Sequence, residues 1–502
     1  MSSSVASRSV DALGWVVLGA LGRVSGQLVV QITLARLLGP EAFGSFAVVL
    51  ALMGLGLVLA DAGFGAALVQ RPNLTEEDIR QALGWTLLLS TTVATVIAMG
   101  AQAFAHLMGD PDLAPMCQVA AVLIVLMSLR NVSVSLLQRQ LDFKGPQLID
   151  FFSYVLCFGG VAIAAATQGW GAWSLLAGFA AQVLFSGVAT YLRCRHSLRP
   201  RLTGDRALAA FGLRAMGNEL TSWAAEQLDR IIIGRAWGLV ALGQYTVSSS
   251  LARAPVGMLM ASVRALTFAG TARAQEDRTA VAAALLLMIE AAVLITVPMF
   301  VIVSLEAEVV LVLVYGPAWR EAAPLLAALA VAVPPLVVST LVSSVLRGIG
   351  AVGLELRVLL VTSALFLLCL AALSSGPLAV AVWCAPVALV LRTAWLTVVV
   401  SGRLDLPMSR VLGALRGAGV LAVWAAGCCL AVRTFAAGPV QTSPVLPLLA
   451  GLVSLALALV AANRLCMSTQ LRELIGRECA GRIQRMRGAR AAAIHSAARD
   501  AS

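Results

Sequence analysis

Apolar segments of about 20 residues follow one another along almost the whole chain, and they constrain its fold more than any motif does. About fourteen can be placed, over residues 12–34, 43–69, 82–107, 113–137, 147–167, 171–192, 208–234, 240–265, 281–305, 322–346, 353–374, 377–400, 411–435 and 443–463. An α-helix of ~20 apolar residues crosses the hydrocarbon core of a bilayer with its backbone hydrogen bonds satisfied. Since 60% of the 502 residues are hydrophobic and 12% are charged, we predict an all-α, multi-pass membrane protein with no separate soluble domain.

Basic residues in the connecting loops predict the orientation. The loops after even-numbered segments hold sixteen Lys or Arg residues, namely Arg71, Arg80, Arg139, Lys144, Arg193, Arg195, Arg199, Arg201, Arg206, Arg273, Arg278, Arg347, Arg357, Arg403, Arg410 and Arg416. The loops after odd-numbered segments hold four: Arg36, Arg235, Arg320 and Arg433. Short cytoplasmic loops are the basic ones, so both termini are expected in the cytoplasm. The net charge of +11 then reflects topology, and no nucleic-acid partner is expected.

Two stretches repeat each other at a constant offset of 199 residues. Residues 35–46 read ARLLGPEAFGSF and residues 234–245 read GRAWGLVALGQY, with Arg, Gly, Ala and Gly at matching positions. The same offset pairs residues 77–78 with residues 276–277, both Glu-Asp. Convergence of Gly-rich connectors is the alternative explanation. Two parallel six-helix repeats are typical of alternating-access transporters, whose substrate site lies between the halves.

The predicted domains follow from this repeat. Residues 1–200 form an N-lobe with helices 1–6, and residues 201–405 form a C-lobe with helices 7–12. Residues 406–465 hold helices 13 and 14, and residues 466–502 form a basic cytoplasmic tail.

Polar side chains inside helices 1, 7 and 8 mark the expected pathway. A charged residue within a span is costly and normally faces a cavity or a partner. Glycines at 19, 22 and 26 accompany the stripe on helix 1 and permit close helix approach. Six residues are the candidate substrate-binding set: Arg23, Gln27, Gln31, Asn218, Ser249 and Arg253. Pro255 is expected to kink or break helix 8.

Four intramembrane acids are candidates for coupling transport to an ion: Asp61, Glu226, Asp229 and Glu290. The alternative for each is a structural ion pair. Glu226 and Arg230 have the i, i+4 spacing of such a pair, and Arg130 and Asp150 stand in similarly apolar surroundings. The sequence contains no phosphate-binding loop with a lysine and no catalytic or metal-ligand pattern, so we expect neither an enzyme nor a cofactor or metal site.

Four stretches in order resemble one known family. The family is the polysaccharide transporter (Wzx-like) family. The stretches similar to it are residues 34–49 (LARLLGPEAFGSFAVV) with 60–78 (ADAGFGAALVQRPNLTEED), 136–150 (LLQRQLDFKGPQLID), 228–263 (LDRIIIGRAWGLVALGQYTVSSSLARAPVGMLMASV) and 314–319 (VYGPAW). These oligosaccharide flippases belong to the multidrug/oligosaccharidyl-lipid/polysaccharide (MOP) exporter superfamily. The resemblance covers roughly residues 10–400; the last two helices match only in number.

The resemblance implies a MATE-like fold of two six-helix bundles around a central cavity in the bacterial inner membrane. It implies transport of an undecaprenyl-diphosphate-linked oligosaccharide for exopolysaccharide, capsule or O-antigen assembly. Arg23 and Arg253 would bind the diphosphate, a proton or sodium ion would couple transport, and glycosyltransferases or a polymerase of the pathway would be partners beside membrane lipids. The alternatives are a multidrug or metabolite exporter of the same superfamily and, from another class, a membrane polymerase or ligase.

The tail after helix 14 carries apolar residues at helical spacing, from Leu471 to Met486, surrounded by arginines. We predict an amphipathic helix on the cytoplasmic leaflet; a disordered basic tail is the alternative.

Overall fold

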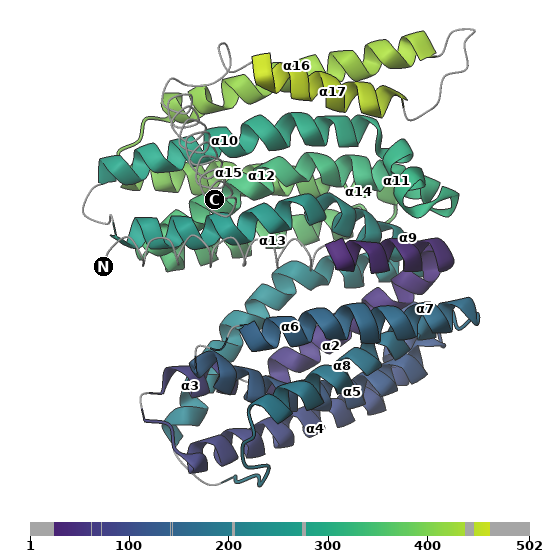
Figure 1. Cartoon of the computed structure of the whole chain (residues 1–502), viewed down its shortest axis with the longest axis vertical. Coiled ribbons are helices and arrows are strands. Elements are labelled where there is room, and N and C mark those ends of the chain that lie inside the picture. The colour runs from purple at the N-terminus through teal and green to yellow at the C-terminus, as the bar shows by residue number, and fades with distance from the viewer. Residues whose placement is uncertain are drawn as a thin grey trace, which may run out of the picture. The chain divides into compact units, whose positions relative to one another are not determined.

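The computed structural model describes residues 25–461, apart from 62, 72, 141, 143, 203–205, 274–277 and 437–445. Every regular element in these residues is helical (Figure 1). The predicted amphipathic tail helix and the candidate Arg23 lie outside the described residues.

The first half of the chain forms a helix over residues 25–37, followed by α2 (Pro40–Asp61), α3 (Phe64–Gln70), α4 (Glu76–Met108), α5 (Leu113–Arg139), α6 (Lys144–Phe152), a π-helical segment η1 (Ser153–Gly159), α7 (Gly160–Thr167) and α8 (Ala172–Arg193). The rest forms α9 (Arg206–Arg273), α10 (Arg278–Leu305), α11 (Ala307–Tyr315), a 3-10 turn η2 (Pro317–Ala322), α12 (Ala323–Gly348), α13 (Val352–Ala372), α14 (Leu378–Ala381), α15 (Cys384–Arg403), α16 (Met408–Ala436) and α17 (Leu446–Ala461).

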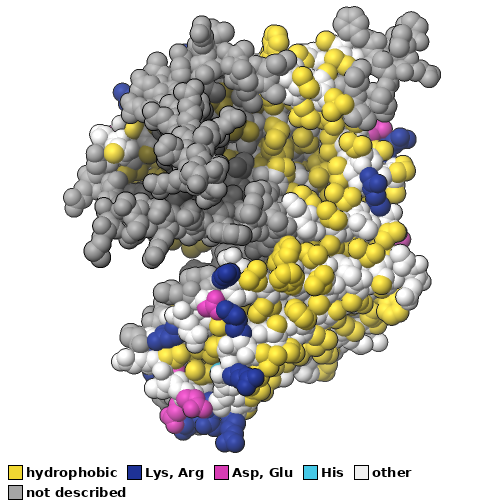
Figure 2. All heavy atoms as spheres, viewed as in Figure 1, with side chains coloured by type: hydrophobic (Ala, Val, Ile, Leu, Met, Phe, Trp, Pro, Cys, Tyr) yellow, Lys and Arg dark blue, Asp and Glu magenta, His cyan; other side chains and the backbone are white. Residues whose placement is uncertain are grey.

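The all-α membrane fold predicted from hydropathy is confirmed. Ten helical stretches among the described residues are long and apolar enough to cross a bilayer, and they coincide with predicted segments 2–6 and 9–13. The first and last predicted segments extend beyond the described residues, so the number fourteen stays a prediction. Large apolar side chains such as Met99 and Val423, 81% and 76% exposed, would contact lipid, and Figure 2 shows hydrophobic side chains spread over the flanks of the helices.

Predicted segments 7 and 8 are joined into the single element α9. Its helical path is interrupted at Gly238, where φ is 86° and ψ is 176°. A residue with a Cβ would be strained at this positive φ, which explains why glycine occupies the bend. Pro255 does not break α9, because the helix continues to Arg273.

The chain divides into two compact units. Unit 1 comprises residues 1–262, 310–329 and 356–388, and unit 2 comprises residues 263–309, 330–355 and 389–502. In unit 1, α5 packs against α2, α4 and α8. In unit 2, α16 packs against both α10 and α17. The predicted division at residues 200, 405 and 465 stays a prediction.

Two ion pairs join helices and loops within unit 1. Arg130 pairs with Asp150, which confirms the structural interpretation of these two charges. In the loop before α6, the Asp142 carboxylate accepts a hydrogen bond of 2.6 Å from Arg193 and another from the backbone N–H of Gly145. The Arg193 guanidinium, together with that backbone donor, lowers the pKa of Asp142 below its ordinary value. These contacts fix the loop between α5 and α6.

A buried carboxylate joins α16 to the end of α10 in unit 2. Glu306 is fully buried, and Arg433 of α16 lies 2.9 Å from one of its oxygens and donates a hydrogen bond to the other. Arg433 also donates to the carbonyl oxygen of Leu305 at 2.7 Å. A buried carboxylate is costly without a partner, so this pair specifies where α16 docks.

We therefore expect Glu306→Gln to destabilise the docking of α16. The amide keeps the shape but loses the charge, at a cost of about 1–2 kcal/mol, because Arg433 remains partly solvated. Thermal unfolding of the purified protein measures this loss. Glu308→Gln, at an exposed position two residues further on, is the matched control; equal stability of the two variants would contradict the role of Glu306.

Candidate functional site

The two repeated connectors pack against each other through their glycines. A Cβ on Gly44 would lie 1.8 Å from the carbonyl oxygen of Leu239, and a Cβ on Gly243 would lie 1.8 Å from the carbonyl oxygen of Pro40. Gly243 and Leu239 stand at the offset of 199 from Gly44 and Pro40. The contact is therefore reciprocal: each connector places its glycine against the backbone of the other. We call these contacts the glycine closure; both connectors are predicted to face outward.

Buried aromatic side chains and an arginine surround the glycine closure. Trp319 is fully buried, donates to the carbonyl oxygen of Ala35 at 2.9 Å and packs edge-on against Phe43. Arg36 donates to the carbonyl oxygens of Leu313 and Val314 at the end of α11. The segment from α11 to η2 thus holds the first connector in place.

Substitution of either glycine by alanine is expected to open or strain the glycine closure, because the added methyl overlaps a carbonyl oxygen. Overpacking of this kind costs about 1–3 kcal/mol. The probe is Ala35→Cys in a cysteine-free background, since Ala35 is 2% exposed in the wild type. A membrane-impermeant maleimide should label this cysteine faster when Gly44→Ala or Gly243→Ala is also present.

Gly39→Ala is the control, because no atom lies within 4 Å of a Cβ at Gly39 in the same connector. If Gly44→Ala and Gly39→Ala are labelled at the same rate, the glycine closure does not control access to this end of the protein.

A buried acid joins the two arms of α9 next to the glycine closure. Asp229 is 9% exposed. Its carboxylate accepts hydrogen bonds from the hydroxyl of Tyr245, at 2.7 Å, and from the backbone N–H of Arg230, at 2.8 Å. The guanidinium groups of Arg230 and Arg253 lie near enough to attract it electrostatically. The acid is therefore held by one hydroxyl and one backbone N–H, with Arg230 and Arg253 as cations in its surroundings.

The first repeat has two apolar residues at the positions that Asp229 and Tyr245 occupy in the second repeat. At the offset of 199, Asp229 corresponds to Val30 and Tyr245 corresponds to Phe46. Val30 and Phe46 are buried in one hydrophobic cluster with Leu34 and Phe158. The equivalent positions of the first repeat are therefore packed without a charge, whereas Asp229 and Tyr245 form a buried hydrogen bond in the second repeat.

The other candidates for substrate binding are dispersed. Gln27 and Gln31 are half-buried on the first described helix. A Cβ on Gly26, beside them, would lie 3.0 Å from Val155, which confirms close approach between this helix and η1. Ser249 is buried one turn before the exposed Arg253. The side chain of Asn218 lies outside the described part of the chain.

The candidate acids have different surroundings. Asp61 ends α2 and accepts a hydrogen bond of 2.6 Å from Asn131 of α5, a contact that holds two helices together. Glu226 is exposed, and the ion pairs of the described residues do not include one between Glu226 and Arg230, the structural alternative for this acid. Glu290 is buried on α10. Among the described residues, no cluster of metal-ligating side chains is found.

Sequence reasoning did not identify two residues of this region as functional. The repeat places Tyr245 at the position of Phe46, and the hydroxyl group that Phe lacks was a signal that could have identified it. Trp319 stood in the VYGPAW stretch without a role, because its partner carbonyl at Ala35 is 284 residues away.

Comparisons with known proteins agree with this geometry. A family model described as polysaccharide biosynthesis protein matches residues 33–324. The succinoglycan biosynthesis transport protein ExoT of Rhizobium meliloti (strain 1021) is 28% identical over 354 residues, which cover 70% of this chain and 71% of ExoT.

Two solved structures share the fold. The lipid II flippase MurJ, in an inward closed conformation, superimposes with a TM-score of 0.68 at 11% identity over 88% of this chain and 97% of MurJ. An inward-facing multidrug resistance transporter of the MATE family of the MOP superfamily superimposes with a TM-score of 0.59 at 16% identity, over 77% of this chain and 98% of that one.

Proposed function

The chain belongs to the polysaccharide biosynthesis protein family, within the MOP superfamily, and we propose that it is a flippase. Its substrate is an undecaprenyl-diphosphate-linked oligosaccharide, which it moves from the inner to the outer leaflet of a bacterial inner membrane. Both termini lie in the cytoplasm. The transport role of ExoT in succinoglycan biosynthesis supports this class of substrate.

The observation that carries the mechanism is the reciprocal glycine closure. The hydrogen bonds of the described side chains include none that joins one connector directly to the other, so the two backbones can separate at their glycines. A closure at the outer ends of two repeats is what alternating access requires when the substrate enters from the inner leaflet. The matched offset of the two contacts supports the proposed N-lobe and C-lobe.

The polar cluster supplies the binding chemistry. Arg253 is exposed and carries the planar guanidinium that suits bidentate binding of a diphosphate. Arg23 is proposed as the second cation, with Gln27, Gln31, Asn218 and Ser249 as hydrogen-bonding partners of the sugars. An inside-negative potential favours outward movement of the two phosphate charges by ~2.3 kcal/mol per charge per 100 mV.

Asp229 is the proposed ion-coupling acid. It lies within the electrostatic reach of Arg253, so neutralising the acid changes the field at the proposed diphosphate site. The apolar pair Val30 and Phe46 at the equivalent place in the first repeat supports a functional use for the charge. Glu226, Glu290 and Asp61 are weaker candidates, and the hydrogen bond from Asn131 gives Asp61 a structural role.

We expect Asp229→Asn to abolish the dependence of transport on a proton or sodium gradient while the protein remains folded, because the amide still accepts from Tyr245 but cannot carry the charge. Initial flipping rates in proteoliposomes, measured with and without an imposed gradient, test this. Tyr245→Phe, which keeps the acid, should retain the gradient dependence. An unchanged gradient response in Asp229→Asn would exclude Asp229 as the coupling group.

Deletion of the gene tests the proposed function directly. In the deletion strain, lipid-linked oligosaccharide should accumulate in the inner leaflet and exported polysaccharide should disappear. Expression of the wild type should reverse both effects, whereas expression of Arg253→Ala should reverse neither. A multidrug exporter, the second candidate, would instead leave lipid-linked oligosaccharide unchanged and raise drug sensitivity on deletion. A membrane polymerase would leave the oligosaccharide flipped but unpolymerised.

A further inference from the structure

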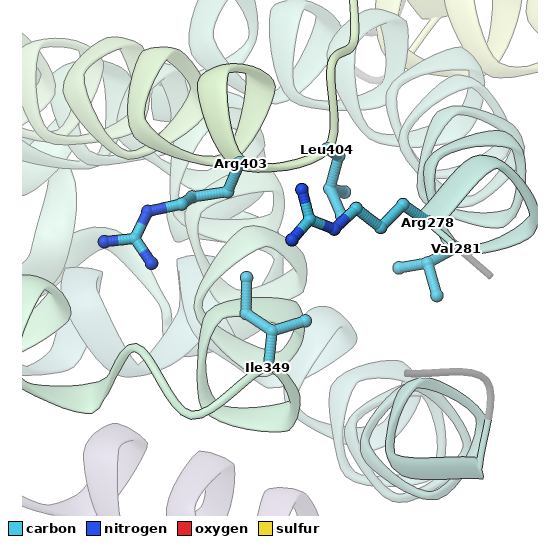
Figure 3. A pocket seen from close by; sticks show the side chains of 5 residues that line it. All are labelled: Arg278, Val281, Ile349, Arg403 and Leu404. Carbon is cyan, nitrogen blue, oxygen red and sulfur yellow. The ribbon is translucent and has the colours of Figure 1, made fainter. Parts of the chain in front are cut away.

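Three predicted inner ends of unit 2 converge on a pocket lined by two arginines. Arg278 begins α10, Arg403 ends α15, and Ile349 follows the end of α12. With Val281 and Leu404, these side chains enclose a cavity of about 210 Å³. Figure 3 shows the Arg278 guanidinium beside Leu404 and Ile349, and the Arg403 side chain extending away from Arg278 on the other side of Ile349. The pocket thus combines an apolar wall with two cations.

The positive charge of the pocket is poorly neutralised by the described residues. Arg278 has one carboxylate near it, that of Asp405, at 4.0 Å, and both side chains are largely exposed, 69% and 85%. No described carboxylate forms an ion pair with Arg403. An exposed pair at this distance contributes little, so an anion with better geometry can displace Asp405.

The conformation of Asp405 places its carboxylate at the pocket. Asp405 has a φ of 50°, the one positive φ among the described residues other than glycine. The backbone N–H of Leu406 bonds the carbonyl oxygen of Ser401, as in the helix ending that usually employs glycine next to the C-cap. An aspartate tolerates this conformation, and here its side chain lies opposite Arg278.

From this arrangement we infer that the pocket binds the phosphate group of an anionic lipid in the cytoplasmic leaflet. A guanidinium group binds two phosphate oxygens at once, so Arg278 and Arg403 offer two binding groups on either side of Ile349, and Ile349, Val281 and Leu404 would contact the apolar part of the lipid. A volume of about 210 Å³ is many times the ~10–15 Å³ that a single water needs on this measure, so the pocket has room for a phosphate head group. The phosphate can belong to a phospholipid or to a polyprenyl diphosphate, and the site does not depend on the transport assignment.

The purified full-length protein in neutral detergent is titrated with phosphatidylglycerol, undecaprenyl diphosphate, inorganic diphosphate and zwitterionic phosphatidylcholine. Bound lipid is measured by native mass spectrometry. We expect Arg278→Gln and Arg403→Gln each to weaken binding of an anionic lipid about fivefold, the factor that corresponds to about 1 kcal/mol per basic residue at an anionic surface. Asp405→Asn, which keeps the backbone conformation accessible, should tighten binding about two- to fivefold.

Arg410→Gln is the matched control, since Arg410 is exposed at the start of α16 and does not line the pocket. Loss of binding in the two pocket variants but not in Arg410→Gln supports the site, and preference for one anionic lipid identifies the source of the phosphate. Three results would overturn it: equal loss in Arg410→Gln, no loss in the pocket variants, or binding of phosphatidylcholine as tight as that of the anionic lipids. Wild-type levels of polysaccharide export in a binding-deficient variant would leave the proposed flippase intact.

Discussion

The direct contact of two backbones at Gly44 and Gly243 is the constraint on which the outer end of unit 1 depends. Neither position has room for a single methyl group, and Trp319 and Arg36 hold the first connector against the segment from α11 to η2. In the proposed mechanism, the same contact determines both the stability of this end and its opening.

The same region shows how two repeats with one geometry can have different chemistry. Val30 and Phe46 fill a hydrophobic cluster in the first repeat, whereas Asp229 and Tyr245 at the equivalent positions form a hydrogen bond near Arg253. A charged group in a bilayer needs partners, and here a hydroxyl, a backbone donor and two guanidinium groups provide them. The asymmetry supports a division of roles, with packing in one half and electrostatic chemistry in the other.

Much of the fold could be predicted from local patterns, because a bilayer allows few kinds of membrane-spanning structure. Ten helical stretches coincide with predicted segments, and Gly238 bends α9 where a connector was predicted. Features that depend on long-range packing could not be predicted. The spacing of Glu226 and Arg230 suggested an ion pair, yet Glu226 is exposed. The hydrogen bond that gives Asp61 a structural role comes from Asn131, which is 70 residues away in the sequence. The pocket of Arg278 and Arg403 joins loops that sequence reasoning treated only as topological signals.

The central claim is that the outer ends separate and rejoin during transport. Double electron–electron resonance between spin labels on Asp112→Cys and Ser374→Cys, both exposed at predicted outer loops of unit 1, tests it in nanodiscs with the nine native cysteines replaced. The account predicts a short distance in the resting protein and a second, longer one that grows in population when lipid-linked oligosaccharide is added and when Gly44 is replaced by alanine. A single distance that neither the substrate nor the substitution changes would contradict it.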